Sequence, residues 1–167
     1  MNTAPFVIRT LDPSIDRSTF SCGVEALDRY FQQQVTQDMR RRVTACFVAV
    51  TDDDRIAGFY TLATASVLLT DLPQSIGKKL PRYPSVPTVR MGRLAVDQGH
   101  KGIGLGGALL ADALDRSSRS EVAAFALVVD AKDKQAVRFY RHHGFIPFPE
   151  AAMTLFLPFE TFKSVGK

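Results

Sequence analysis

Five glycines between Gly99 and Gly107 lie directly before helix-forming sequence in the stretch VDQGHKGIGLGGALL, which starts at Val96. Each glycine that is fixed in regular structure costs roughly 0.5–1 kcal/mol relative to alanine. A run of them therefore indicates that another group approaches the backbone closely. The start of a helix presents unpaired N–H groups and the positive end of the helix dipole, which together bind phosphate. The stretch predicts a phosphate-binding loop.

Two common phosphate-binding folds are disfavoured by the details of this stretch. Residues 102–107, GIGLGG, match the GxGxxG pattern of dinucleotide-binding proteins, but that pattern alone is weak. Five residues, DQGHK, separate Val96 from these glycines, whereas in dinucleotide folds the glycines follow the strand almost at once. The chain after residue 102 is also too short for the second half of a doubly wound domain. A P-loop is excluded because no Gly-Lys-Ser/Thr follows.

A better match is the acetyl-CoA-binding motif of the GNAT acyltransferases, in which a strand ends in a loop of Arg or Gln, two residues, Gly, one residue, and Gly or Ala. The stretch RLAVDQGHKGIGLGGALL resembles it, with the pattern on Lys101, Gly104 and Gly106 and lysine in the first position. The resemblance implies acetyl-CoA as the acetyl donor, with its pyrophosphate on the backbone N–H groups and Lys101 adding a point charge. The residues expected to bind acetyl-CoA are Leu94, Ala95, Val96, Lys101, Gly102, Ile103, Gly104, Leu105, Gly106, Gly107, Asp133 and Phe139.

A second part of the resemblance lies about thirty residues later, in DAKDKQAVRFYRHHGF. It is similar to the family segment that ends in Leu or Phe, Tyr, three residues and Gly-Phe, which here places Tyr140 and Gly144 in the pattern. Asp133 stands where the family often has Asn, and it can still cap a helix. The resemblance implies that Tyr140 is the general acid for the leaving thiolate, because a phenol with a pKa near 10 stays protonated at neutral pH. A packed tyrosine without a catalytic role is the alternative.

The segment FSCGVEALDRYF resembles the first helix of a GNAT subgroup that acts as toxins in bacterial toxin–antitoxin pairs. The matching residues are Phe20, Cys22, Gly23, Leu27, Asp28, Tyr30 and Phe31. The resemblance implies acetylation of the α-amino group of aminoacyl-tRNA, which blocks translation. It also implies a ribbon-helix-helix antitoxin as partner, with DNA bound only through the toxin–antitoxin complex, and it allows a homodimer.

The residues themselves are compatible with a charged tRNA as acceptor. No motif aims Glu25, Asp28, Glu121 or Asp130 at the thioester as a general base. A lysine amine has a pKa of about 10.4, whereas an α-amino group has one of about 7.7–8.0 and needs little help to react. The net charge is +4, and clustered basic residues can follow phosphates. The expected tRNA contacts are Arg40, Arg41, Arg42, Lys78, Lys79, Arg82, Arg90 and Arg93, with Arg93 placed to hold the acceptor end.

Two other functions stay open. A GNAT enzyme that acetylates a small amine or a protein or peptide amine would not need the basic clusters. A protein that keeps the fold only to bind an antitoxin or DNA would not need the glycines and Tyr140. The three histidines and two cysteines form no metal motif, so we expect no metal. No apolar run approaches the roughly 18 residues of a membrane span, and the first residues lack a signal-peptide pattern. We therefore expect a cytoplasmic protein without a membrane partner.

The elements that must position these motifs follow from the hydrophobic pattern. We expect strands at 6–11, 45–51, 56–70, 88–96, 123–131, 145–148 and 152–159, and helices at 23–42, 105–119 and 134–143. Ser21 is available to cap the first helix, and Gly144 stops the last. Residues 71–88 contain four prolines and predict an irregular excursion with at most one short helical turn.

The predicted fold class is α/β, as a single GNAT acetyltransferase domain over residues 1–167. An antiparallel meander in the first half precedes a β-α-β-α-β run that needs a parallel strand pair. The resemblance implies a central mixed, mostly antiparallel sheet flanked by helices. In that sheet the strands at 88–96 and 123–131 are the splayed parallel pair that holds pantetheine, and a backbone N–H near Leu94 polarises the thioester carbonyl.

Overall fold

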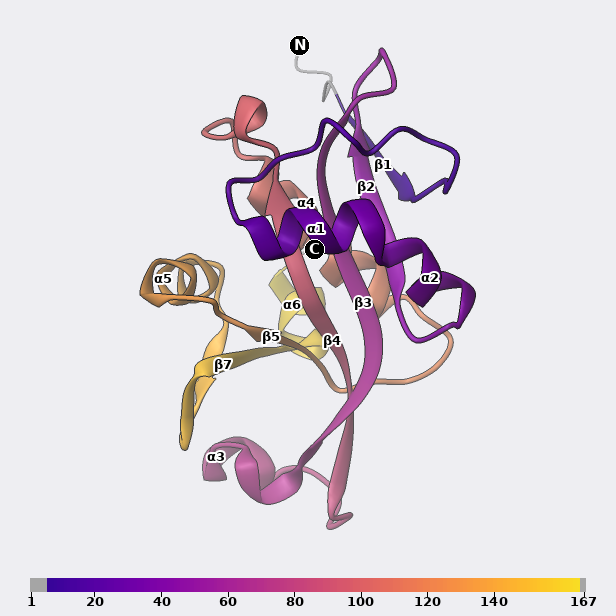
Figure 1. Cartoon of the computed structure of the whole chain (residues 1–167). Coiled ribbons are helices and arrows are strands. Elements are labelled where there is room, and N and C mark those ends of the chain that lie inside the picture. Colours follow the sequence, from indigo (N-terminus) through magenta and orange to yellow (C-terminus); the bar gives the residue numbers. More distant parts are fainter. Residues whose placement is uncertain (1–5, 166–167) are drawn as a thin grey trace. The chain divides into compact units, whose positions relative to one another are not determined.

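Seven strands, six α-helices and two short 3-10 helices are present in the computed structural model, which describes residues 6–165 (Figure 1). In chain order they are β1 (Val7–Thr10), α1 (Glu25–Gln33), α2 (Val35–Arg40), β2 (Ala45–Val50), β3 (Ile56–Leu68), η1 (Leu69–Asp71), α3 (Gln74–Gly77), β4 (Ser85–Val96), η2 (Gln98–His100), α4 (Leu105–Ser118), β5 (Ala126–Asp130), α5 (Lys134–His142), β6 (Ile146–Phe148), β7 (Ala151–Pro158) and α6 (Phe159–Val165). None of the described helices has the length and apolar character needed to cross a membrane.

The strands form a mixed sheet in the order β1-β2-β3-β4-β5-β7-β6. The pairs β1/β2, β2/β3, β5/β7 and β6/β7 are antiparallel, and β4/β5 is parallel. The parallel register joins Thr88–Met91 to Ala126–Val129 and ends there, although β4 continues to Val96. The predicted mixed sheet with one parallel pair between helices is confirmed.

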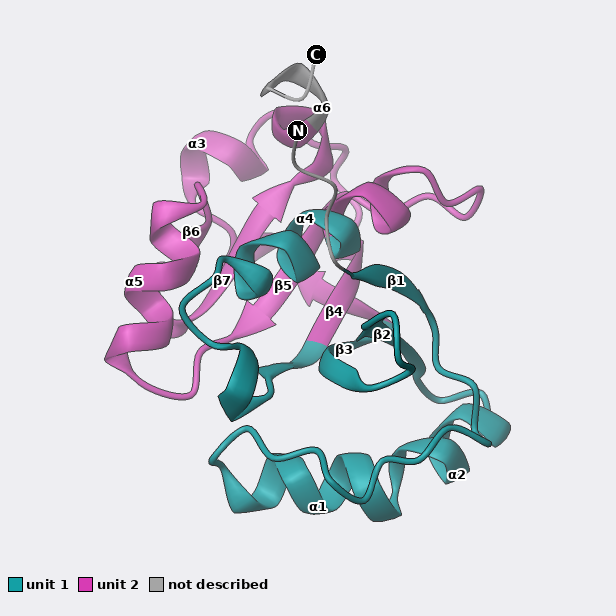
Figure 2. Ribbon diagram, turned by 90° about the horizontal axis from the view of Figure 1, so that it is seen from above, with its two compact units in different colours: residues 1–63, 92–113 teal, residues 64–91, 114–167 magenta. Residues whose placement is uncertain are grey.

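The chain divides into two compact units, each with its own core (Figure 2). Unit 1 contains residues 1–63 and 92–113, and unit 2 contains residues 64–91 and 114–167. The core of unit 1 is built around Phe20, Phe31 and Phe59, and that of unit 2 around Val128 and Phe156. The expectation of a single domain stays a prediction.

The strands of unit 1 are covered by helices on both faces, with α1 and α2 on one side and α4 on the other (Figure 2). On the first face the ring of Phe31 stacks on that of Phe59 at a centroid distance of 4.2 Å. On the opposite face a Cβ at Gly58 would lie 2.8 Å from Leu109 Cδ1. Because successive residues of a strand point to opposite faces, Gly58 and Phe59 define the two packing surfaces. Leu109 of α4 is fully buried there.

Two predictions about the first helix are wrong. Residues 23–42 form two helices, α1 and α2, which meet at Gln34 with a φ of −119°. The N-cap residue of α1 is Val24, without a side-chain hydrogen bond, and not Ser21. The Ser21 hydroxyl instead donates to the carboxylate of Asp28 at 3.3 Å. The Ser21 hydroxyl thus binds a side chain of α1 and not the free backbone N–H groups at the start of that helix.

Smaller differences concern the strands beside the proline-rich segment. β3 ends at Leu68, two residues earlier than predicted, and β4 begins at Ser85, three residues earlier. The N–H of Leu69 donates to the carbonyl of Pro84 at 2.9 Å, which brings these two strand ends together. β5 begins only at Ala126. The single short helical turn expected in the excursion is α3.

Candidate active site

The predicted phosphate-binding loop has an unusual backbone at two glycines. Gly102 and Gly104 have φ values of +80° and +83°, in the left-handed region that side chains rarely adopt. A Cβ at either position would meet no atom within 4 Å, so the space beside the loop is open. The helix that follows, α4, has 14 residues, and its first N–H groups have no acceptor within the helix. These residues fit the diphosphate of acetyl-CoA.

The loop is anchored to the segment Ser21–Gly23, which we call the anchor segment. The N–H of Gln98 donates to the carbonyl of Ser21 at 2.8 Å, and the N–H of Ser21 donates to the carboxylate of Asp97 at 3.0 Å. The ammonium of Lys101 donates to the carbonyl of Cys22 at 2.7 Å. Lys101 was expected to lie on a phosphate, and in this structure its ammonium instead ties the loop to the anchor segment. Its contact with a phosphate stays a prediction.

Helix α1 holds the anchor segment from the other side. The carboxylate of Asp28 accepts from the N–H of Cys22 at 2.8 Å, and the side chain of Gln32 donates to the carbonyl of Phe20 at 2.8 Å. Gly23 has a φ of +93°, and a Cβ there would lie 2.6 Å from Gln98 Nε2. The Phe-x-Cys-Gly and Leu-Asp pattern thus connects α1 to the phosphate loop. From the sequence this pattern was visible only as a family likeness, because spacing alone does not show which backbone groups the side chains of Asp28 and Gln32 bind.

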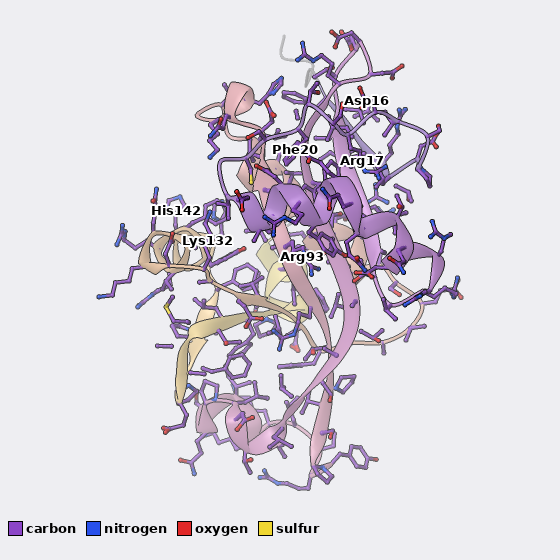
Figure 3. All side chains as sticks on the ribbon, in the orientation of Figure 1. Asp16, Arg17, Phe20, Arg93, Lys132 and His142 are labelled. Carbon is purple, nitrogen blue, oxygen red and sulfur yellow. The ribbon has the colours of Figure 1, made fainter. Side chains whose placement is uncertain are left out.

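Arg93 of β4 lies close to α1 (Figure 3). Its guanidinium carbon is 3.4 Å from the ring centroid of Tyr30. The Tyr30 hydroxyl donates to the carboxylate of Asp38 at 2.7 Å, and this hydrogen bond lowers the pKa of Asp38. Burial, followed by that hydrogen bond, raises the pKa of Tyr30. Tyr30 and Asp38 therefore hold the guanidinium of Arg93 in place. The expected binding of Arg93 to the tRNA acceptor end stays a prediction.

Tyr140 is buried on α5, with 6% of its surface exposed. Its ring contacts those of Phe139 and Phe145 at centroid distances of 5.2 Å and 5.6 Å. Burial raises the pKa of Tyr140 to about 12, and the negative charge of Asp130 adds to the shift. The phenol is protonated at neutral pH, as a general acid requires. Within residues 6–165 the structure shows no hydrogen bond of its hydroxyl.

Asp130 joins two strands near Tyr140. It forms an ion pair with Arg90 of β4, and the hydroxyl of Thr154 donates to it at 3.0 Å. Arg90 was expected to bind tRNA. In this structure its charge is matched by a carboxylate on the neighbouring strand, and its contact with tRNA stays a prediction. Asp133, at the start of α5, caps that helix by accepting from the N–H of Ala136 at 2.8 Å. Its capping role is confirmed, and its contact with acetyl-CoA stays a prediction.

The remaining basic residues lie in two exposed groups. The first begins at the last residue of α2, and the second follows α3. Their members are Arg40, Arg41 and Arg42 in unit 1, and Lys78, Lys79 and Arg82 in unit 2. None of the six forms an ion pair with a residue that the structure describes. They are therefore available to a polyanion, and their expected binding to tRNA stays a prediction.

The family model described as Acetyltransferase (GNAT) family matches residues 13–145. This chain belongs to the GNAT acetyltransferase family. It is 33% identical over 151 residues to a "tRNA-acetylating toxin" of Mycobacterium tuberculosis, covering 89% of each chain. It is 28% identical over 170 residues to the "Probable toxin TacT" of Sinorhizobium fredii, covering 95% of this chain and 94% of the relative.

Several solved structures to which this chain is similar contain a bound tRNA, acetyl-CoA or antitoxin. One shows AtaT complexed with acetyl-methionyl-tRNAfMet, with a TM-score of 0.89, 29% identity and coverage of 97% of this chain and 99% of that chain. Another shows AtaTR bound with AcCoA, with a TM-score of 0.85, 27% identity and coverage of 99% and 100%. A third shows a mutant AtaT toxin bound to the C-terminus of the antitoxin AtaR, with a TM-score of 0.82, 25% identity and coverage of 96% and 98%.

Proposed function

We propose that this GNAT enzyme transfers acetyl from acetyl-CoA to the α-amino group of aminoacyl-tRNA, and so acts as a toxin that blocks translation. The observation that carries the proposal is the nearly full-length likeness to AtaT in its complex with acetyl-methionyl-tRNAfMet. The relative named as a tRNA-acetylating toxin supports the same reaction.

The donor is held by the phosphate loop and by the end of β4. The backbone N–H groups from Gly102 to Gly107 receive the pyrophosphate, and the positive end of the α4 dipole favours its charge. Residues Leu94–Val96 lie beyond the last registered pair of the parallel ladder, and their backbone groups are the proposed pantetheine contacts. Acetyl-CoA supplies the acetyl group as an activated thioester.

The acceptor is an amine that reacts without a strong base. An α-amino group whose carboxyl is acylated, as at a peptide N-terminus, has a pKa of about 7.7–8.0, so part of it is the free amine at neutral pH. Its nitrogen attacks the thioester carbonyl, and a backbone N–H near Leu94 stabilises the oxyanion. Tyr140 then donates its phenolic proton to the sulfur that leaves, and the excess proton of the amine returns to the phenolate or passes to water. Its raised pKa keeps that proton in place until the thiolate forms.

The partners of the relatives suggest how the toxin is controlled. Structures of AtaT include complexes with the antitoxin AtaR and an AtaT–AtaR complex bound to DNA. The proposed partner of this chain is accordingly a cognate antitoxin of the ribbon-helix-helix type, with DNA contacted through the complex. The proposed compartment is the cytoplasm, where charged tRNA is found.

The reaction is tested by incubating the protein with acetyl-CoA and a pool of charged tRNA, followed by digestion and detection of N-acetylated aminoacyl-adenosine. Uncharged tRNA should accept nothing, because it lacks the α-amine. The Tyr140→Phe variant is the matched control, since it keeps the ring and loses the proton. The opposite result would be acetylation of a polyamine or peptide, without salt dependence, while the charged tRNA stays unmodified. The toxin proposal would then be wrong, and the protein would be a small-amine acetyltransferase.

A further inference from the structure

Unit 2 contains a cavity of about 380 Å³ that the proposed chemistry has not used. Its volume lies at the lower end of the roughly 300–1,000 Å³ typical of small-ligand sites. Val67, Leu68 and Phe148 supply apolar walls, and Asp71, Glu150 and Arg90 supply charged groups. The cavity therefore suits a single small group that carries both apolar and polar parts.

The uncompensated charge of this cavity is negative. Arg90 is already paired with Asp130, so its positive charge is matched from the neighbouring strand. Asp71 and Glu150 are exposed at the rim, and among the described residues neither carboxylate has an ion-pair or hydrogen-bond partner. A protonated amine is attracted to such a rim, and a second carboxylate is repelled.

The same cavity is connected to the proposed general acid through one carboxylate. Thr154 lines the cavity and donates to Asp130 at 3.0 Å. The charge of Asp130 also contributes to the raised pKa of Tyr140. Arg90 and Asp130 directly adjoin the point where the parallel ladder ends, at Met91 and Val129. The wall of the cavity thus adjoins, through Asp130, the end of the paired strands.

We infer that this cavity receives the aminoacyl group of the charged tRNA, and that Asp71 and Glu150 discriminate against acceptors with acidic side chains. The inference rests on the proposed function, because it names the amino acids that the same reaction accepts. Juxtaposed like charges are costly. Glutamyl and aspartyl acceptors should therefore react about tenfold or more slowly than the isosteric glutaminyl and asparaginyl acceptors.

The test uses one tRNA body charged in turn with glutamine and with glutamate, so that only the side-chain charge differs. The wild-type ratio of kcat/KM for glutaminyl over glutamyl acceptor should be about 10 or more. The double variant Asp71→Asn, Glu150→Gln should bring this ratio close to one. Glu121→Gln, an exposed carboxylate that does not line the cavity, is the matched control and should leave the ratio unchanged.

Filling the cavity provides a second test that does not depend on charge. Ala151 lines the cavity and is exposed, so Ala151→Trp should narrow it without disturbing a core. The variant should slow transfer to methionyl-tRNA at least tenfold more than transfer to glycyl-tRNA, because a glycyl group needs no side-chain space. Circular dichroism and the affinity for acetyl-CoA should match the wild type.

The outcomes separate the two claims. Charged tRNA could be acetylated while the double variant leaves the glutaminyl-over-glutamyl ratio unchanged and Ala151→Trp leaves the relative rates of methionyl-tRNA and glycyl-tRNA unchanged. That result would overturn the cavity assignment and leave the proposed function intact. An equal loss with every acceptor in Ala151→Trp would also overturn it, because the side chain of the acceptor would then lie elsewhere. Failure of the wild-type protein to acetylate any charged tRNA would overturn the proposed function, and this assignment with it.

Discussion

The anchor segment should control the affinity for acetyl-CoA even though none of its residues is among the expected acetyl-CoA contacts. In the variant Gly23→Ala, the new Cβ would lie 2.6 Å from Gln98 Nε2, and the residue would keep a φ of +93°. The first conflict is mild, because the end of a flexible side chain can move. The second is a backbone cost of roughly 1–2 kcal/mol for a residue with a Cβ in the left-handed region. The segment should therefore shift, and its bonds to Asp97, Gln98 and Lys101 should weaken.

The size of the effect follows from that strain. If all of it is relieved when the phosphate loop detaches, acetyl-CoA must restore the loop on binding, and the affinity falls by about 5- to 30-fold, since about 1.4 kcal/mol is tenfold. Titration calorimetry with acetyl-CoA measures this directly. Adding Gln98→Ala removes the contact but not the strain, so the double variant should recover only a small part of the loss.

Gly99→Ala is the matched control for this prediction. Gly99 lies in the same loop and is not among the glycines with positive φ, and a Cβ there would lie 3.3 Å from Asp97 Oδ2. We expect less than about a threefold loss of affinity, because a small shift of one carboxylate relieves the contact. A folded Gly23→Ala protein with wild-type affinity would refute the coupling. An equal loss of affinity in Gly99→Ala would show that any substitution in the loop weakens acetyl-CoA binding, whether or not it strains the anchor segment.

Three further predictions concern the reaction. Tyr140→Phe should lower the single-turnover rate by about 10²–10⁴-fold with little change in acetyl-CoA affinity, and near wild-type turnover would make Tyr140 a packing residue. Because the pKa of Tyr140 is raised to about 12, its proton is retained well above neutral pH. The rate should therefore rise through the acceptor-amine pKa of about 7.7–8.0 and show no fall up to about pH 10, whereas a falling limb near pH 8 would contradict the assignment. The logarithm of tRNA affinity should fall with the logarithm of salt concentration by about 0.7–0.9 per phosphate contact, and charge reversal at Arg40–Arg42 should flatten that slope in a filter-binding assay without affecting acetyl-CoA.

Local patterns in the sequence were sufficient for much of the donor side. The glycines at 102 and 104 predicted a loop whose backbone another group can approach closely. In the structure both glycines have a positive φ. The cap at Asp133 and the end of α5 before Gly144 were likewise predicted correctly. Each of these features depends on interactions within a few residues, so short-range spacing contains the information. The mixed sheet was predicted too, although through a family likeness and not through strand pairing.

Interactions between distant residues were decided only by the tertiary structure. Ser21 was expected to cap a helix. Instead its N–H donates a hydrogen bond to Asp97, 76 residues away, and its hydroxyl donates one to Asp28. The register of β4 and β5 pairs Arg90 with Val128 and so brings its side chain to the carboxylate of Asp130, 40 residues away in the chain. The acidic rim of the cavity likewise unites Asp71 and Glu150, which no spacing relates. The sequence by itself determined which chemical groups this enzyme has and which backbone segment we propose to hold phosphate. Only the folded sheet decided which charges neutralise each other and which stay available, because that depends on strand register and burial.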